Sequence, residues 1–234
     1  ETTSGMTTAE IESVLGSEDL RNLLEVAEQS GTVKHAELAE VLEPLELDEM
    51  EREDLAFVIH DGDIKSGRSE CSDAALRDVL AVFETSAHPL IYVPGDNEWT
   101  DCHRKSNGGY DPLERLARLR QLFFADERSL GRRRIALERQ SADPQFAAWR
   151  ENVRWTAAGV LFVGLNVPGS DNNYRGTGKE DVPSREYLER NRANRAWLAQ
   201  AFALARARKL VGILFAIQGN PGFHAANAGH PGSG

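Results

Sequence analysis

Two segments of the sequence each consist of a β-branched apolar run that stops at the dipeptide Gly-Asp. The first run leads to Asp63 and the second leads to Asp96. A strand that delivers a carboxylate on a glycine-containing turn is a common way to build a metal or phosphate site, because glycine lets the backbone and a ligand approach closely. Since the arrangement occurs twice, we expect both carboxylates to belong to one shared site.

The pattern between these two runs predicts how they are connected. Residues 55–91 follow the order strand, loop, helix and strand, with the helix expected over residues 72–85. Such a βαβ unit pairs its strands in parallel through a right-handed crossover. Because parallel neighbours end at the same edge of a sheet, the topology predicts that Asp63 and Asp96 converge there. The alternative is that both aspartates only cap turns or helices.

The remaining patterns predict an α/β protein with appended ends. Apolar residues at spacings of three and four predict helices within 7–54, 112–125, 143–150 and 184–208, and apolar runs predict strands at 160–166 and 210–217. The glycine-rich stretch 222–234 has no periodic pattern and is expected to be a flexible tail. We therefore divide the chain into an acidic helical segment at 1–54, an α/β domain at 55–221 and this tail.

Composition and charge restrict the class of protein. The 234 residues, 41% hydrophobic and 27% charged, are typical of a globular chain with one sizeable core. No apolar run approaches the roughly 20 residues that span a bilayer, so a soluble protein is expected. The net charge of −10 disfavours nonspecific binding to nucleic acid or anionic membranes. The sequence does not indicate a cellular location.

The motifs, in their order along the chain, resemble a known enzyme family. Gly62-Asp63 is followed by Gly95-Asp96-Asn97-Glu98, by a strand ending at Asn166, and by a strand ending at Gln218-Gly219-Asn220-Pro221. This order is similar to that of the calcineurin-like metallophosphoesterases, and Gly-Asp-Asn-Glu-Trp-Thr-Asp-Cys is similar to a loop of one bacterial branch. The resemblance covers residues 55–221. It implies an αββα sandwich in which two metal ions, bridged by an aspartate, activate water against a phosphate ester.

The resemblance assigns roles to individual residues by position. Asp63 matches the bridging aspartate, and Asp96 stands where the family usually has an asparagine ligand. Asn97 stands where the family commonly has its catalytic histidine, and Gln218 where it commonly has a histidine ligand. His60, on the strand that leads to Asp63, is a further catalytic candidate. Packing in the core or at the sheet edge is an equal alternative for this histidine.

Two parts of the family pattern have no match in this chain. The opening Asp-x-His strand should precede Leu55, and the closing Gly-His-x-His loop should follow Pro221, where Gly229-His230-Pro231 is a poor substitute. We therefore expect an incomplete metallophosphoesterase-like αββα sandwich with weak or lost hydrolysis. The remaining oxygen ligands predict at best a hydrated divalent ion such as magnesium or calcium, because transition metals prefer imidazole or thiolate.

The acidic segment 1–54 carries a second, weaker resemblance. The stretches that begin at Ser17 and Ser30, together with the acidic run 46–54, are similar to the acidic N-terminal region of bacterial primary sigma factors. In those proteins this region is a small helical module that occupies the DNA channel of RNA polymerase. Joined to an internal piece of a phosphoesterase, it suggests a chimeric chain. The alternative functions are a non-enzymatic, self-associating module and a sigma-factor-like regulator.

The cysteines and the two missing family segments lead to two further expectations. Cys71 and Cys102 each lie a few residues beyond a Gly-Asp turn, so turns that meet would bring them within the ~5.5 Å Cα separation of a disulfide. A disulfide would suit a parent enzyme that is exported, whereas two sulfurs alone specify a soft-metal site poorly. Loss of the family's first strand and final segment is expected to leave a sheet edge unpaired and apolar faces exposed. This predicts a homodimer formed by edge strands or by the helices within 7–54.

Overall fold

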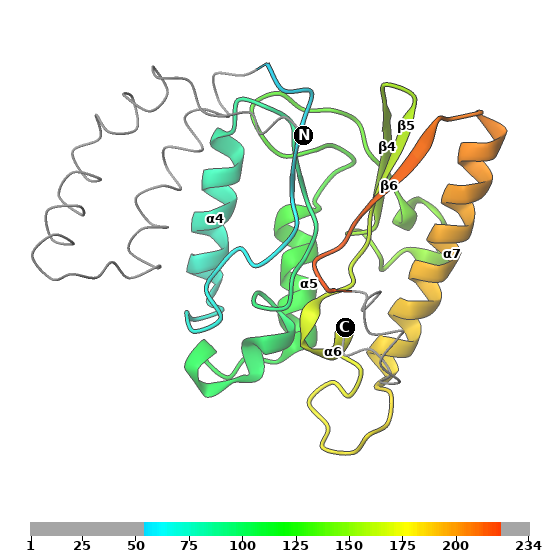
Figure 1. Cartoon of the computed structure of the whole chain (residues 1–234). Helices are drawn as coiled ribbons and strands as arrows, with labels where there is room; N and C mark the ends of the chain where they lie inside the picture. The colour runs from blue at the N-terminus through cyan, green and yellow to red at the C-terminus, as the bar shows by residue number, and fades with distance from the viewer. Residues whose placement is uncertain (1–53, 221–234) are drawn as a thin grey trace, which may run out of the picture. The chain divides into compact units, whose positions relative to one another are not determined.

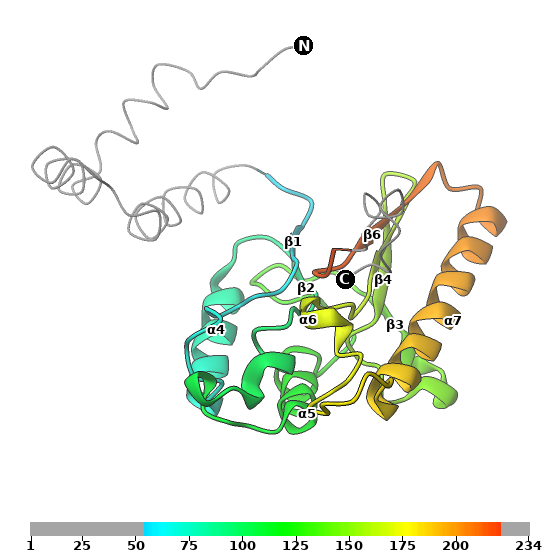
Figure 2. The ribbon, with the colours of Figure 1, turned by 60° about the horizontal axis from the view of Figure 1, so that its bottom comes forward.

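The computed structural model describes residues 54–220 (Figures 1 and 2). The chain divides into two units, Glu1–Leu55 and Ala56–Gly234, and the fold is that of the second unit. The predictions of acidic helices and of a sigma-factor-like module at 1–54, apart from Asp54 itself, lie outside the described residues, as does the predicted tail at 222–234.

The predicted βαβ unit forms the first sheet. Strand β1 (Val58–His60) pairs in parallel with β2 (Leu90–Tyr92), and helix α4 (Asp73–Thr85) connects them. The helix begins where expected because the side chain of Ser72 accepts a hydrogen bond from the Ala75 N–H at 3.3 Å, which caps its first turn. The C-terminal ends of β1 and β2 therefore lie side by side.

Helix α5 (Pro112–Phe123) follows two short 3-10 turns, η1 (Thr100–His103) and η2 (Lys105–Asn107). Asp111 caps α5, since its Oδ1 accepts a hydrogen bond from the Glu114 N–H at 2.9 Å. Pro112 suits the first helical position because it has no backbone N–H, and an N–H at this position would have no partner within the helix. The predicted helix at 112–125 is therefore confirmed to within two residues.

The prediction of a helix at 143–150 is wrong. The chain forms a short 3-10 turn there, η4 (Pro144–Phe146), which follows another, η3 (Gln140–Ala142). The Gln140 N–H donates to the Asn152 carbonyl at 2.9 Å, so the chain after η4 is already drawn into an extended ladder. A continuing helix would direct these backbone groups along its own axis and break that pairing.

The second sheet has four strands in the order β3-β4-β5-β6. Strands β3 (Glu138–Arg139), β4 (Val153–Ala157) and β5 (Val160–Gly164) are antiparallel neighbours. Helix α7 (Arg185–Ala207) then returns the chain to β6 (Gly212–Ala216), which pairs in parallel with β5. The sequence patterns predicted β5, α7 and β6, whereas β3 and β4 were not predicted.

Three apolar cores place these elements in layers. Helices α4 and α5 pack against one face of the first sheet, and α7 packs against the outer face of the second sheet. Between the two sheets lies a third core, formed by Phe57, Ile59, Ile91, Leu137, Val153, Trp155 and Phe162 with Ile135. Figure 1 shows α4 and α5 on one side of the strands and α7 on the other. The protein is thus a mixed α/β fold, as predicted.

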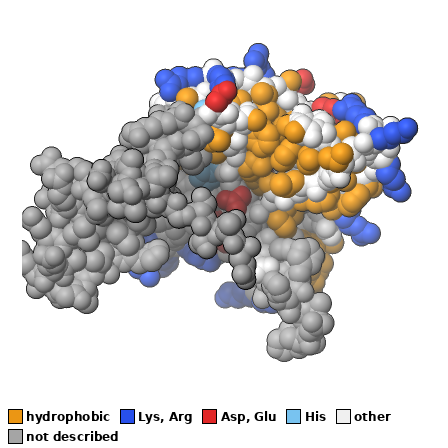
Figure 3. Space-filling view, turned by 45° about the horizontal axis from the view of Figure 1, so that its top comes forward, with side chains coloured by type: hydrophobic (Ala, Val, Ile, Leu, Met, Phe, Trp, Pro, Cys, Tyr) orange, Lys and Arg blue, Asp and Glu red, His pale blue; other side chains and the backbone are white. Residues whose placement is uncertain are grey.

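Within residues 54–220, no strand pairs with the outer edge of β1 or with the outer edge of β6. The end of the second sheet also exposes apolar side chains, with Val211 83% and Leu214 44% accessible. Figure 3 shows apolar side chains gathered on one face, with lysine and arginine at its rim. In the same part of the chain, no helix combines the length and apolarity needed to cross a membrane.

Candidate functional site

The two Gly-Asp turns meet, which confirms the predicted convergence of Asp63 and Asp96. A Cβ added to Gly95 would lie 2.5 Å from both the N and the Oδ1 of Asp63, so the second turn has room only for glycine. In the first turn, Gly62 has φ of 96° and Asp63 has φ of 56°, and glycine adopts such values at no steric cost. The paired glycines therefore let two backbones touch and bring their carboxylates together.

Gln218, which follows β6, joins the two carboxylates. Its Nε2 donates to Asp63 Oδ2 at 3.1 Å and to Asp96 Oδ1 at 3.3 Å. Its Oε1 accepts a hydrogen bond from the Gly169 N–H, and this bond sets the orientation of the amide because a carbonyl oxygen is needed there. The amide N–H groups therefore lie where a cation would otherwise separate two negative charges.

A left-handed turn after β5 closes another side of the site. It contains α6 (Gly169–Asn172), and the four consecutive residues from Ser170 to Asn173 have φ between 48° and 57°. This conformation costs roughly 1–2 kcal/mol for most residues, although asparagine and aspartate tolerate it. Ser170 Oγ lies 2.7 Å from Asp96 Oδ2 and 2.8 Å from Asp101 Oδ1, so its one O–H can donate to either carboxylate and hold the strained turn.

Asn97 lies beside the carboxylates. Its backbone N–H donates to Asp63 Oδ1 at 3.4 Å, and its side-chain Nδ2 donates to the Lys65 carbonyl at 3.2 Å. The side-chain NH2 group of Asn97 has two N–H bonds, so after this hydrogen bond the second N–H can donate to a ligand.

His60 contacts aromatic rings on the helical side of β1. Its ring centroid lies 4.9 Å from that of Phe83 on α4 and 6.3 Å from that of Tyr92 on β2. Side chains of a strand alternate between its two faces, and His60 occupies the face that packs on α4. The structure therefore brings Asp63, Asp96, Asn97 and Gln218 together, and it places His60 in this aromatic cluster.

Burial, together with nearby negative charge, raises the pKa of two acidic groups at the site. Burial raises the pKa of Asp63, and the hydrogen bond and charge of Asp96 raise it further, against the opposing donors Asn97 and Gln218. Glu98 is fully buried, and burial raises the pKa of its carboxyl to about 7. Its Oε1 accepts hydrogen bonds from Gly95 N–H at 2.6 Å and Tyr92 O–H at 2.8 Å, which oppose part of this increase.

A disulfide between Cys71 and Cys102 ties the two loops together, as predicted, with a Cα separation of 5.7 Å. Both residues are fully buried. Cys71 lies beyond the first Gly-Asp turn and Cys102 beyond the second, so the bond closes the same junction that the carboxylates form. It thereby holds the two turns at a set distance.

The donor set fits a hydrated hard cation better than a transition metal. Asp63 and Asp96 offer carboxylate oxygens, and Gln218 offers an amide oxygen only if it gives up its bond to Gly169. Among residues 54–220, no group of three or more His, Cys, Asp or Glu side chains is arranged to hold a metal ion. Two carboxylates with a competing amide donor leave most of the coordination to water.

Sequence reasoning missed three residues of this site: Glu98, Asp101 and Ser170. Asp101 is only 3% exposed, and its Oδ2 pairs with Arg104 Nη1 at 2.7 Å. A signal for Ser170 existed in the turn-rich stretch 168–173, whose asparagine and aspartate residues favour left-handed backbone. No local pattern indicated that this turn would contact the second Gly-Asp loop, because the two lie 74 positions apart at Ser170 and Asp96.

Comparison of the chain with protein-family models, curated proteins and solved structures found no match.

Proposed function

We propose that this protein is a metal-dependent phosphoesterase-like protein whose hydrolysis is weak or lost. The fold we propose is an incomplete metallophosphoesterase αββα sandwich. One observation carries the proposal: two strand-terminal aspartates converge, and an amide N–H group bridges them at the position a cation would take. The convergence supports descent from a metal site, and the amide supports its impairment.

A divalent ion at this site would be held by Asp63 and Asp96, with Gln218 as a third ligand once its oxygen is released from Gly169. Such an ion would supply neutralisation of the phosphate charge and a lowered pKa of bound water. Asn97 has one side-chain N–H left to bind and orient a phosphate oxygen. An amide does not transfer protons near neutral pH, so Asn97 cannot protonate a leaving group as a histidine would.

The test combines metal analysis with hydrolysis of an aryl phosphate by the full chain. We expect substoichiometric divalent metal and a slow hydrolysis that chelator abolishes and that Asp63→Asn also abolishes. The matched control is Asp61→Asn, because Asp61 lies in the same loop with an exposed side chain. Fast hydrolysis, or hydrolysis that both chelator and Asp63→Asn leave unchanged, would overturn the proposal.

A second candidate function, a self-associating module without catalysis, is favoured by the open edge of β6. Among residues 54–220, no strand pairs with the outer edge of β6, and Val211 beside this strand is 83% exposed. Exposed edges of this kind pair readily with another chain. A homodimer formed through β6 would satisfy the edge and cover the apolar side chains.

A further inference from the structure

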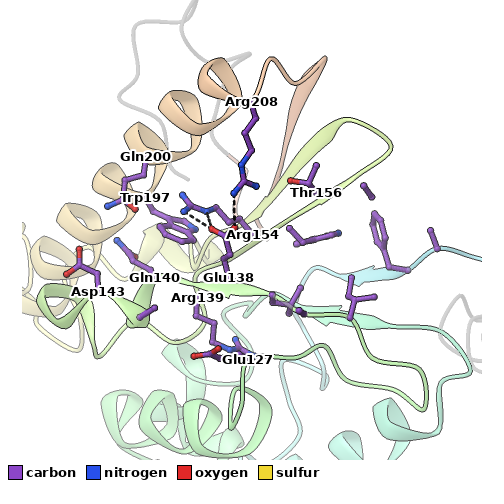
Figure 4. Close-up of a pocket in the computed structure, with 18 residues that line it drawn as sticks. Glu127, Glu138, Arg139, Gln140, Asp143, Arg154, Thr156, Trp197, Gln200 and Arg208 are labelled. Carbon is purple, nitrogen blue, oxygen red and sulfur yellow. Dashed lines mark hydrogen bonds and ion pairs between the residues drawn. The ribbon is translucent and has the colours of Figure 1, made fainter.

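A groove of about 860 Å³ runs along the outer edge of β4 (Figure 4). Phe57, which precedes β1, lines the groove, whereas the carboxylate site follows the C-terminal end of β1. The groove and the carboxylate site are therefore at opposite ends of this strand. The groove is independent of the proposed phosphoesterase activity.

The outer edge of β4 is only partly paired. Strand β3 pairs Glu138 with Arg154 and Arg139 with Val153, and the chain before β3 turns away, since Ala136 pairs with Arg128. In an antiparallel ladder, alternate residues direct their N–H and C=O to the same neighbour.

A hydrogen bond on this edge shows which residues of β4 direct their backbone groups toward it. The Gln140 N–H donates to the Asn152 carbonyl, so Arg154 and Thr156 direct their backbone groups to the same side. Within residues 54–220, no strand pairs with Thr156 on that side, and Thr156 is exposed. One N–H and one C=O are thus available to an added strand.

The two walls of the groove differ in chemistry. On the side between the sheets, Phe57, Ile135 and Trp155 form an apolar wall. On the side of α7, Figure 4 shows Arg154 and Arg208 both directed at Glu138. Glu138 Oε2 lies 2.8 Å from Arg154 Nη2, and Glu138 Oε1 lies 3.7 Å from Arg208 Nη2.

Glu127 and Asp143 also line the groove, and the excess of positive charge is local to the part of the α7 wall beside Glu138. Two guanidinium groups share the single carboxylate of Glu138, and Arg208 remains about half exposed. Arg154 Nη1 has no hydrogen-bond partner among the described residues. An acidic side chain placed beside this pair would balance the second guanidinium, since a carboxylate is the natural bidentate partner of arginine.

We propose that this groove binds an extended segment of a partner protein, which adds a strand to β4. The segment pairs with the Thr156 backbone and alternates apolar side chains, which pack on the wall of Phe57 and Trp155, with acidic side chains, which face Arg154 and Arg208. Side chains of an extended strand alternate between two faces, which matches one apolar and one cationic wall. Main-chain bonds supply affinity and the alternating side chains supply specificity.

The probe is an end-blocked, dye-labelled heptapeptide that alternates valine and glutamate, and its binding to the full chain is measured by fluorescence anisotropy. A block peptide of the same composition and a backbone N-methylated peptide serve as ligand controls. Both are expected to bind at least about tenfold more weakly, because one loses the alternation and the other loses the main-chain donors.

Two variants test the protein side. Thr156→Pro removes an N–H that points to the open edge and is expected to weaken binding at least about tenfold. Arg208→Glu is expected to weaken binding of the valine–glutamate peptide about fivefold. It is also expected to strengthen binding of a peptide that alternates valine and lysine. The control is Arg206→Glu in the last turn of the same helix, outside the groove. Thermal unfolding followed by circular dichroism verifies that each variant is folded.

Equal binding of the alternating and block peptides would overturn the proposal, as would unchanged affinity in both Thr156→Pro and Arg208→Glu. Light scattering tests whether a second copy of this chain, instead of a partner protein, occupies the edge. A dimer that Thr156→Pro converts to a monomer would show that a second copy of this chain occupies the edge, which also overturns the proposal. Because the N-methylated peptide changes only the ligand, its result stands even where a protein variant fails to fold.

Discussion

Gln218 donates hydrogen bonds to two carboxylates that would otherwise repel each other. Its Nε2 contacts Asp63 and Asp96, and its Oε1 is held by Gly169. A neutral donor stabilises such a pair less than a divalent cation does, but it needs no ion and its amide does not titrate. The identity of this one residue thus determines how well the site competes for metal.

We predict that Gln218→His raises the affinity for zinc at least about tenfold, because an imidazole nitrogen replaces an amide donor between two carboxylates. Titration calorimetry of the full chain measures the dissociation constant. Gln200→His is the control, since it introduces the same side chain at the groove beside β4, away from the carboxylates. Equal zinc affinity in Gln218→His and the parent protein would contradict a metal position between Asp63 and Asp96.

Glu98 gives the protein a stability that depends on pH. Burial raises the pKa of its carboxyl from 4.5 to about 7, so the folded protein favours the protonated form. The stabilisation is complete below pH 4.5 and is lost as the pH rises through 7. We predict that Glu98→Gln raises the free energy of unfolding at pH 8 by roughly 1–3 kcal/mol and changes it little at pH 4.5.

Urea unfolding at the two pH values, with chelator present, measures this difference. Glu180→Gln serves as the control because Glu180 is exposed. If Glu98→Gln and the parent protein differ in stability by the same amount at pH 4.5 and pH 8, Glu98 is excluded as the source of the pH-dependent stability.

At the level of elements, the junction of the two Gly-Asp loops is held by covalent and noncovalent contacts. The disulfide spans 31 positions, and the backbones of the two turns touch at Gly62 and Gly95. The loops carry few strand hydrogen bonds of their own, since β1 and β2 end before them. Their positions therefore depend on this junction.

We predict that thiol titration of the unfolded, unreduced protein finds no free sulfhydryl. Reduction should lower the free energy of unfolding by about 3–4 kcal/mol, because the unfolded chain gains the entropy of an open loop of about 30 residues. The double variant Cys71→Ser/Cys102→Ser is the control, and its stability should not respond to reductant. Two free thiols before reduction would contradict the bond.

For the whole molecule, the open edge of β6 favours association. We predict a homodimer at high micromolar protein, and Val211→Lys should shift it to the monomer because a charged side chain at the start of an edge strand opposes pairing. Light scattering across a concentration series measures the mass. Val82→Lys on α4 is the control, since Val82 is 59% exposed and lies on a helix. A monomeric mass at all concentrations, with a sharp unfolding transition, would show that one chain covers its own core.

The sequence by itself determined the elements whose signals are local. Ser72, Asp111 and Ser184 each accept a hydrogen bond from an N–H three residues later, which starts α4, α5 and α7 at predictable positions. The two Gly-Asp runs likewise predicted the parallel pair and the convergence of Asp63 with Asp96. A cap, a turn and a periodic apolar face act over a few residues, so a short window of sequence contains their cause.

Only the tertiary structure decided which partners these side chains find. Strand β4 was not predicted, and Arg154 within it lies 4.2 Å from the ring centroid of Trp197 on α7. Gln218 meets Asp63 across 155 positions, and Ser170 meets Asp96 across 74. These contacts arise when sheets and helices pack, and each depends on the placement of elements far away in the chain. The motif order predicted Gln218 as a site residue, but its hydrogen bonds to both carboxylates depended on how the two sheets pack.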